Sequence, residues 1–128
     1  MYGLSGPDYL RTANEDVLIY IIIEHEQAVA NIDQILSVPG IDGAFFGFAD
    51  YAASIGLTGQ TTHPRVIEAR EKVLAATQRA GVAAGYAARS LSQAQELARM
   101  GFRLITLGSD AGFILQGARE MLVGMASV

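Results

Sequence analysis

Four apolar runs alternate with stretches of helical spacing, and this order restricts the fold more than any other feature of the chain. The runs are rich in β-branched or small residues, as expected for strands that are covered on both faces. The stretches between them are long enough for the helical crossovers that join parallel strands. The sequence therefore predicts an α/β fold of four consecutive β/α units. The predicted strands are residues 17–24, 41–48, 82–88 and 102–107.

The predicted sheet has two possible forms. With 128 residues, the chain is long enough for one domain, 1–128, with a single core. Four parallel strands can form an open sheet, or they can form half of a (β/α)8 barrel, which normally takes roughly 250 residues. A sheet of four strands on its own leaves two unpaired edges, and unpaired edges favour pairing with another chain.

Helical spacing of apolar residues predicts the connecting helices. A short helix is expected at 7–14, before the first strand, and others at 26–38 and 51–57. The next helix is expected to start with Thr62 as its cap and to end at Gly81. After it, Ser90 or Ser92 is expected to cap a fourth connecting helix. The last helix, 111–125, is apolar on more than one side, which indicates packing against another chain. The stripe of the Thr62 helix expected to face the core is Val66, Ala69, Val73, Leu74 and Ala76.

Composition excludes several classes of function. The net charge is −4, Lys72 is the single lysine and the eight arginines are scattered, so no nucleic-acid surface is expected. The absence of cysteine excludes disulfides and thiolate metal sites. No apolar run reaches the roughly 18 residues that a membrane span needs. The first seven residues lack the pattern of a signal peptide, so a cytoplasmic protein is expected.

Two carboxylates follow consecutive predicted strands. Glu24 ends the first apolar run and Asp50 closely follows the second. Parallel strands lie about 4.8 Å apart, so side chains at their carboxyl ends can converge, and active sites of α/β folds form there. The pair could be a general acid and base with separated pKa values, or two oxygen ligands of a hard cation. Alternatively, Asp50 caps the following helix and Glu24 is a solvated strand end.

A few further residues have a structural and a functional interpretation. His25 is expected in a surface or loop role, although it could also be a third ligand or a base. His63 is expected to cap a helix or to face solvent. Asp110 either caps the last helix or lines the mouth of a site. Gly47 and Gly108 lie where the backbone approaches a ligand closely or where a turn needs positive φ, and the sequence does not separate these alternatives.

An ordered set of motifs resembles the HpcH/HpaI family of metal-dependent pyruvate aldolases, which includes relatives of the citrate lyase β-subunit. The resemblance covers residues 8 to 122 approximately, and it lies in the order of the motifs more than in any one of them. Members of the family are (β/α)8 barrels, so the resemblance implies that this chain is similar to their C-terminal half, strands five to eight. The motifs are residues 9–15, 23–25, 28–32, 38–43, 47–50 and 107–110.

The resemblance also implies roles for individual residues. Glu24 and Asp50 match the family's ligands of a divalent metal, which implies Mg²⁺ or Mn²⁺, with Co²⁺ as a further candidate. The backbone amides of Ala49 and Asp50 match those that bind the carboxylate of pyruvate, and Gly47 leaves room for the substrate. The implied reaction is the reversible aldol cleavage of a 4-hydroxy-2-keto acid to pyruvate and an aldehyde.

The sequence departs from the family pattern at three points. Ile22 stands where the family has a glutamine that contacts the keto acid, and Phe48 stands where it has a proline. The histidine–acid pair and the arginine of the family's first half have no match here. The alternative expectation is a catalytically incomplete half-barrel that acts as a subunit, a binding module or a remnant. The expected small-molecule partner is pyruvate or a related 2-keto acid. The expected protein partner is a further copy of the chain or an N-terminal half-barrel. The resemblance favours further copies, since family members are commonly hexamers with exchanged C-terminal helices.

Overall fold

The computed structural model describes residues 6–126, and within this range the chain forms four strands and seven helices. None of these helices combines the length and the hydrophobicity that a membrane-spanning segment requires. The elements are α1 (Gly6–Asp16), β1 (Tyr20–Ile23), α2 (Glu26–Ala30), α3 (Ile32–Leu36), β2 (Gly43–Phe46), α4 (Phe48–Ser54), α5 (Pro64–Ala80), β3 (Ala83–Ala88), α6 (Leu91–Met100), β4 (Leu104–Leu107) and α7 (Asp110–Ala126).

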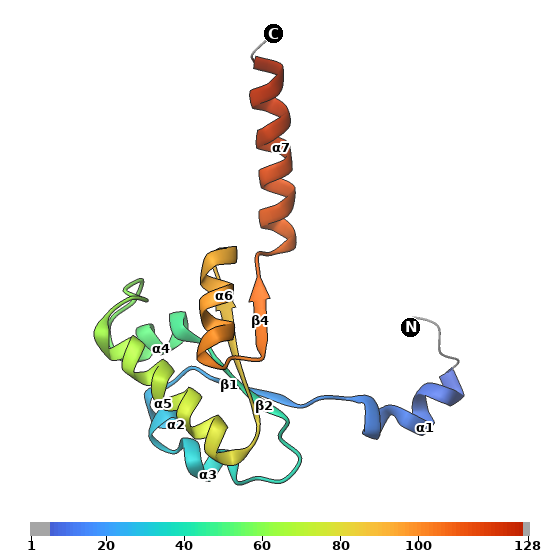
Figure 1. The fold of residues 1–128 in the computed structure, drawn as a ribbon, viewed down its shortest axis with the longest axis vertical. Coiled ribbons are helices and arrows are strands. Elements are labelled where there is room, and N and C mark those ends of the chain that lie inside the picture. Colours follow the sequence, from blue (N-terminus) through green and yellow to red (C-terminus); the bar gives the residue numbers. More distant parts are fainter. Residues whose placement is uncertain (1–5, 127–128) are drawn as a thin grey trace.

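The four strands form one parallel sheet in the order β1-β2-β3-β4 (Figure 1). Tyr20 lies opposite Gly43 where β1 pairs with β2, and Gly85 lies opposite Leu104 where β3 pairs with β4. Every strand therefore ends at the same edge of the sheet, as the predicted succession of β/α units requires. β1 and β4 are the two edge strands, and each pairs on one side only within the described residues.

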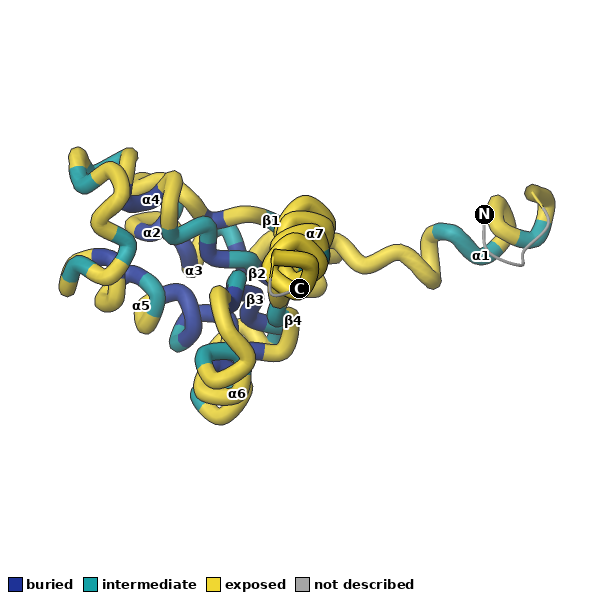
Figure 2. The backbone as a smooth tube through the Cα atoms, turned by 90° about the horizontal axis from the view of Figure 1, so that it is seen from above, coloured by how far each residue is buried: buried dark blue, intermediate teal, exposed yellow. Residues whose placement is uncertain are grey.

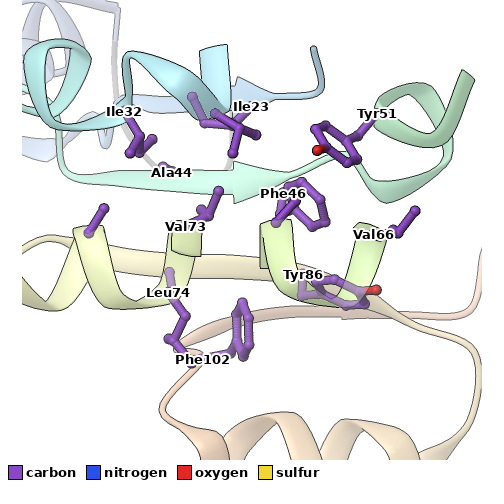
Figure 3. Close-up of a cluster of buried hydrophobic side chains, with 14 of the residues drawn as sticks. Ile23, Ile32, Ala44, Phe46, Tyr51, Val66, Val73, Leu74, Tyr86 and Phe102 are labelled. Carbon is purple, nitrogen blue, oxygen red and sulfur yellow. The ribbon is translucent and has the colours of Figure 1, made fainter. Parts of the chain in front are cut away.

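The helices α2 to α6 lie on one face of the sheet and form the core with it (Figure 2). α5 contacts β2 and β3, and α6 contacts β3 and β4. The predicted inward stripe of α5 is confirmed, since all five of its residues are buried. Phe46 lies at the centre of an aromatic group, with its ring centroid 5.3 Å from Tyr51 and 6.2 Å from Tyr86 (Figure 3).

The first strand predicted at 17–24 is present but shorter, Tyr20–Ile23, and within the described residues it is covered on one face, not on both. Helices cover only one face, so side chains of β1 alternate between burial and exposure: Ile23 is 2% exposed and Ile22 is 60% exposed. The strand starts at Tyr20 because that residue is the first with a partner in β2. Val17 and Leu18 precede the sheet and are exposed despite their hydrophobicity.

The predicted helix at 26–38 is instead two short helices, α2 and α3, that meet at Asn31. Asn31 has φ −100° and ψ 17° and is at once the last cap of α2 and the first cap of α3. Asparagine is poor in helix interiors because its side chain competes for backbone hydrogen bonds. The predicted burial is nevertheless correct, since Val29, Ile32 and Leu36 are all in the core.

The helix caps confirm some predictions and correct one. His63, not Thr62, caps α5, because its Nδ1 accepts a hydrogen bond from the backbone N–H of Arg65 at 3.2 Å. Ser90 caps α6 through a bond from the N–H of Gln93. Gly81 ends α5 with φ 70°, as expected for a glycine in the left-handed region.

The first and last helices have no buried residue. α1 and α7 extend away from the sheet and its covering helices, as Figure 1 shows. α7 exposes a series of large apolar side chains, which agrees with the prediction that this helix is apolar on more than one side. These side chains are Phe113, Ile114, Leu115, Met121, Leu122, Val123 and Met125.

Candidate functional site

Glu24 follows the last residue of β1 at the carboxyl edge of the sheet, and its side chain lies against Gly47. A Cβ atom at position 47 would be 2.8 Å from the Cβ and 3.1 Å from Oε2 of Glu24. The same atom would be 3.3 Å from Cγ2 of Ile22. Ile22 and Glu24 therefore both face Gly47 from the side of the sheet that the helices leave open.

The backbone of Gly47 connects the end of β1 to α4. Its N–H donates a hydrogen bond to the carbonyl of Ile23 at 3.0 Å, and its carbonyl accepts one from the N–H of Tyr51 at 2.9 Å. Gly47 has φ −81°, which other residues adopt easily, so the glycine is required here for space. The alternative that Gly47 needs positive φ is therefore wrong, and the close approach to a ligand stays a prediction. Gly108 combines φ 74° with a close approach to Phe113.

Asp50 lies in the first turn of α4, because this helix starts at Phe48 and not at Tyr51 as predicted. Gly47 is the cap residue of α4, so the alternative role of Asp50 as the cap is wrong. Asp50 and Glu24 are both exposed, and neither forms a hydrogen bond or ion pair with another described residue. Both carboxylates are therefore free to bind a cation from solution.

The first turn of α4 also presents backbone donors. The N–H groups at the start of a helix have no partner inside it, and here they include those of Ala49 and Asp50. Gly47 supplies no side chain to cap them. The same turn thus offers N–H donors to an anion and a carboxylate to a cation.

Both histidines are capping residues, a role that was predicted for His63 but not for His25. Nδ1 of His25 accepts a hydrogen bond from the N–H of Gln27 at 3.2 Å and caps α2. His63 has the same role in α5. Among residues 6–126, no three His, Cys, Asp or Glu side chains are grouped so that they could hold a metal ion. A metal at this edge would therefore have at most two of these described side chains as ligands and would need further ligands from water or substrate.

The last predicted site residue, Asp110, lies at the start of α7. Its Oδ1 accepts a hydrogen bond from the N–H of Ala111 at 2.7 Å, and Ser109 Oγ accepts one from the N–H of Gly112 at 3.1 Å. Asp110 is the first residue of α7, and Ser109 before it is the cap, because its carbonyl accepts the first bond of the helix from the N–H of Phe113. The predicted capping role of Asp110 is therefore wrong.

A second group of polar side chains lies near the carboxyl edge, and no pattern in the sequence indicates it. Arg70 in α5 and Arg89 after β3 line one small cavity with Tyr86. Burial raises the pKa of the Tyr86 phenol, while the positive charges of Arg70 and Arg89 lower it. The two arginines are far apart in the sequence and match no motif, so only the fold brings them together.

Comparison with known proteins identifies relatives of one kind. The sequence matches the family model of HpcH/HpaI aldolase/citrate lyase over residues 4–116. A hydroxypyruvate/pyruvate aldolase from Paraburkholderia phytofirmans is 35% identical over 121 residues, which are 94% of this chain and 46% of that protein. A 4-hydroxy-2-oxo-heptane-1,7-dioate aldolase from Shigella sonnei is 33% identical over 115 residues, which are 90% and 44% of the two chains.

The solved structures show the same relationship. An HpcH/HpaI aldolase/citrate lyase family protein from Burkholderia cenocepacia superposes with a TM-score of 0.84 at 35% identity. The superposition covers 98% of this chain and 53% of that chain. The chain thus spans about half the length of the relatives that it matches.

Proposed function

The chain belongs to the HpcH/HpaI aldolase/citrate lyase family, and we propose that it carries the metal-binding and keto-acid-binding part of an aldolase. The proposed reaction is the reversible aldol cleavage of a 4-hydroxy-2-keto acid to pyruvate and an aldehyde. The observation that carries the proposal is the unpaired carboxylate of Glu24, which lies on Gly47 next to the first turn of α4. The activities named for the two aldolase relatives support the same class of reaction.

The donor set at this edge fits a hard divalent cation. Glu24 and Asp50 offer oxygen ligands without competing partners, and Mg²⁺ is often bound by one or two carboxylates plus water and substrate. We propose Mg²⁺ or Mn²⁺ here, with Co²⁺ as a further candidate. When bound, such an ion supplies Lewis-acid chemistry that stabilises negative charge on the keto acid.

The residues around the carboxylates have complementary roles in the proposal. The N–H groups of Ala49 and Asp50 bind the carboxylate of pyruvate or a related 2-keto acid, and the start of a helix favours an anion there. Gly47 leaves room for the side chain of Glu24 beside the start of α4, because it has no side chain of its own. Ile22 adds an apolar contact in place of a hydrogen-bonding side chain, so substrate binding depends more on the amides and the cation.

We propose further that the four β/α units form half of a (β/α)8 barrel that another half completes. The exposed Ile22 face of the sheet, the two edge strands and the match to about half of each relative support this proposal. The completing half is a second copy of this chain or an N-terminal half-barrel. It would supply the base and the arginine that no residue of 1–128 matches in the family pattern.

The second candidate function is a binding subunit without turnover of its own. Ile22 favours it, because an apolar side chain occupies the position where the family pattern has a glutamine that contacts the keto acid. Under this hypothesis the chain retains the cation site and the backbone amides at the start of α4, and it lacks the groups that transfer protons. The two candidates share one site and differ in catalysis, so they can be tested in sequence.

Binding of Mn²⁺ to the full chain, measured by calorimetry or electron paramagnetic resonance, tests the site. Glu24→Gln and Asp50→Asn should each weaken binding by at least about tenfold, because each removes a charged ligand. Glu96→Gln is the matched control, since Glu96 is exposed on α6, away from the site. Equal affinity in Glu24→Gln and the unaltered chain would show that the cation binds elsewhere.

Turnover and assembly separate the two candidates. Pyruvate release from a 4-hydroxy-2-keto acid, which stops on chelation and returns with Mn²⁺, would support the aldolase. Binding of Mn²⁺ and pyruvate without turnover would support the binding subunit. Native mass spectrometry of the same sample shows whether copies of the chain associate. A chain that binds no cation and releases no pyruvate in any assembly would contradict both.

A further inference from the structure

A small cavity lies between α5, α6 and the carboxyl end of β3, separate from Glu24 and Asp50. Its volume is about 90 Å³. In the part of the chain that the structure describes, neither of these two carboxylates nor any other acidic side chain lines it. The aromatic rings of Phe48 and Tyr86 stack at its inner wall with their centroids 5.0 Å apart. The polar side chains around it are Thr61, Thr62, Arg70, Tyr86, Arg89 and Gln93.

Arg70 brings an unsatisfied donor to this cavity. Its side chain is only 20% exposed, and its Nε is buried without a hydrogen-bond partner among the described residues. Its ion-pair partner among residues 6–126 is Glu71, whose Oε1 is 3.7 Å from Nη2 and which is itself 61% exposed. Such a distance is too long for a strong hydrogen bond, so Glu71 does not satisfy the guanidinium. A buried donor without an acceptor is costly, which favours a site where an acceptor binds.

Arg89 is fixed at the opposite wall by three contacts. Its Nη2 donates a hydrogen bond to Oγ1 of Thr61 at 2.8 Å, and its backbone N–H donates one to Oε1 of Gln93 at 2.8 Å. Its guanidinium carbon lies 5.2 Å from the centroid of the Phe48 ring, within the range of a cation–π interaction. None of these contacts neutralises the charge of Arg89, so its position is set while its charge stays available.

Two arginines line this cavity without an acidic residue among the described lining residues, which is unusual in a chain of net charge −4. Glu71, the ion-pair partner of Arg70, is mostly exposed. The positive charges of both arginines act on the buried phenol of Tyr86, which agrees with their location around one space. Guanidinium groups bind carboxylates and phosphates through paired N–H donors. Pockets for whole metabolites usually measure about 300–1,000 Å³, so this cavity has room only for a compact group.

We propose that this cavity binds a small oxyanion, a carboxylate or phosphate group, between Arg70 Nε and the guanidinium of Arg89. The anion gives the buried Nε–H an acceptor and lies between the two positive charges. Thr61 and the neutral phenol of Tyr86 are the further donors within the cavity. This site does not need the divalent cation proposed above, and its ligand does not contact Glu24.

The Arg Nε–H resonances of the full chain provide a direct test. Titration with sodium phosphate and with sodium acetate, at constant ionic strength and with EDTA present, should move the Arg70 Nε–H resonance in a saturable way. Sodium chloride at the same ionic strength should not. Arg99, exposed on α6, is the internal control and should stay unmoved. The anion that binds with the higher affinity in these titrations shows whether the site prefers phosphate or carboxylate.

Variants separate a built site from general attraction of anions. Arg70→Lys keeps the positive charge and removes the Nε–H donor, so anion affinity should fall by at least about tenfold. Arg89→Gln should reduce it similarly, whereas Arg99→Gln and Glu24→Gln should leave it unchanged. Saturable binding that survives Arg70→Lys would overturn the proposal. An Arg70 resonance that responds equally to chloride would also overturn it. This comparison uses the unaltered chain, so it does not depend on whether the variants fold.

Discussion

The side chain of Glu24 occupies the space that any side chain at position 47 would need. The distance of 2.8 Å from a Cβ at Gly47 to Cβ of Glu24 is shorter than real Cβ contacts allow. Cβ of Glu24 is attached to the backbone at the end of β1, so it cannot move away as the end of a flexible side chain could. The absence of a side chain at Gly47 therefore leaves the space in which the side chain of Glu24 lies.

Gly47→Ala should disrupt the candidate site without straining the backbone, because φ −81° suits alanine. The added methyl group must displace Glu24 or the start of α4. We expect the free energy of unfolding to fall by about 1–3 kcal/mol and Mn²⁺ affinity to fall with it. Urea denaturation and calorimetry measure the two effects.

Gly117→Ala is the matched control for this substitution. Gly117 lies within α7, and a Cβ there would meet nothing within 4 Å. Alanine is the better helix former by about 1 kcal/mol, so stability should be unchanged or slightly raised. Mn²⁺ affinity equal to that of the unaltered chain in Gly47→Ala would mean that Glu24 does not bind the cation from its present position.

The order of elements could be predicted because the hydrophobic period changes sharply between strands and helices. Val66, Val73 and Ala76 of α5 recur at helical spacing, and the structure buries all three. Pro64 marks the start of this helix and Gly81 marks its end, and both signals depend only on the residue itself. Both ends of the helix are therefore close to the prediction. These features depend on neighbouring residues alone.

Features that depend on distant residues could not be predicted in the same way. The apolar residues Phe48 and Ala49 continue the pattern of β2, so the sequence does not show that α4 starts there and includes Asp50. The exposure of Ile22 depends on all helices covering one face, which no local pattern reveals. The meeting of Arg70 and Arg89 requires the packing of α5 against β3.

Phe46 should be among the residues whose truncation costs most stability. It is fully buried, between the rings of Tyr51 and Tyr86. Phe46→Ala removes these contacts and leaves a cavity, and we expect a loss of about 3–5 kcal/mol in the free energy of unfolding. Phe113→Ala, at a side chain that is 62% exposed on α7, is the comparison. In a monomer it should cost far less, and a similar cost would indicate that α7 is buried in an assembly.

Stability should decrease at alkaline pH because of buried tyrosine. Burial raises the pKa of Tyr86 above its ordinary value of 10.0, against the opposing effect of Arg70 and Arg89. The folded chain thus keeps a phenolic proton that the unfolded chain releases. The contribution of the neutral Tyr86 phenol to the free energy of unfolding is complete below about pH 10. It is lost as the pH rises through the pKa of Tyr86 in the folded chain.

Urea denaturation between about pH 8 and pH 11 measures this dependence. Tyr86→Phe should show a shallower decline above pH 10 than the unaltered chain, because phenylalanine has no proton to release. Tyr9→Phe, at an exposed position in α1, should leave the decline unchanged. An identical slope in Tyr86→Phe and the unaltered chain would assign the alkaline sensitivity to another group, such as Tyr51, whose pKa burial also raises.

Ile22→Gln should improve keto-acid binding at little cost in stability. Ile22 is 60% exposed and faces Gly47 beside Glu24, so a polar side chain loses few apolar contacts there. We expect a change of less than about 1 kcal/mol in the free energy of unfolding. A glutamine amide within reach of a bound keto acid adds a hydrogen bond, worth roughly a two- to tenfold increase in pyruvate affinity with Mn²⁺ present.

Leu18→Gln is the control for this gain, since Leu18 is 69% exposed and lies before β1, away from Gly47. It introduces the same amide without placing it at the site, so pyruvate affinity should not change. Calorimetric titration of pyruvate into the Mn²⁺-loaded full chain measures all three proteins under one condition. Equal pyruvate affinity in Ile22→Gln and Leu18→Gln would show that the keto acid binds away from the end of β1, even where Glu24 binds the cation.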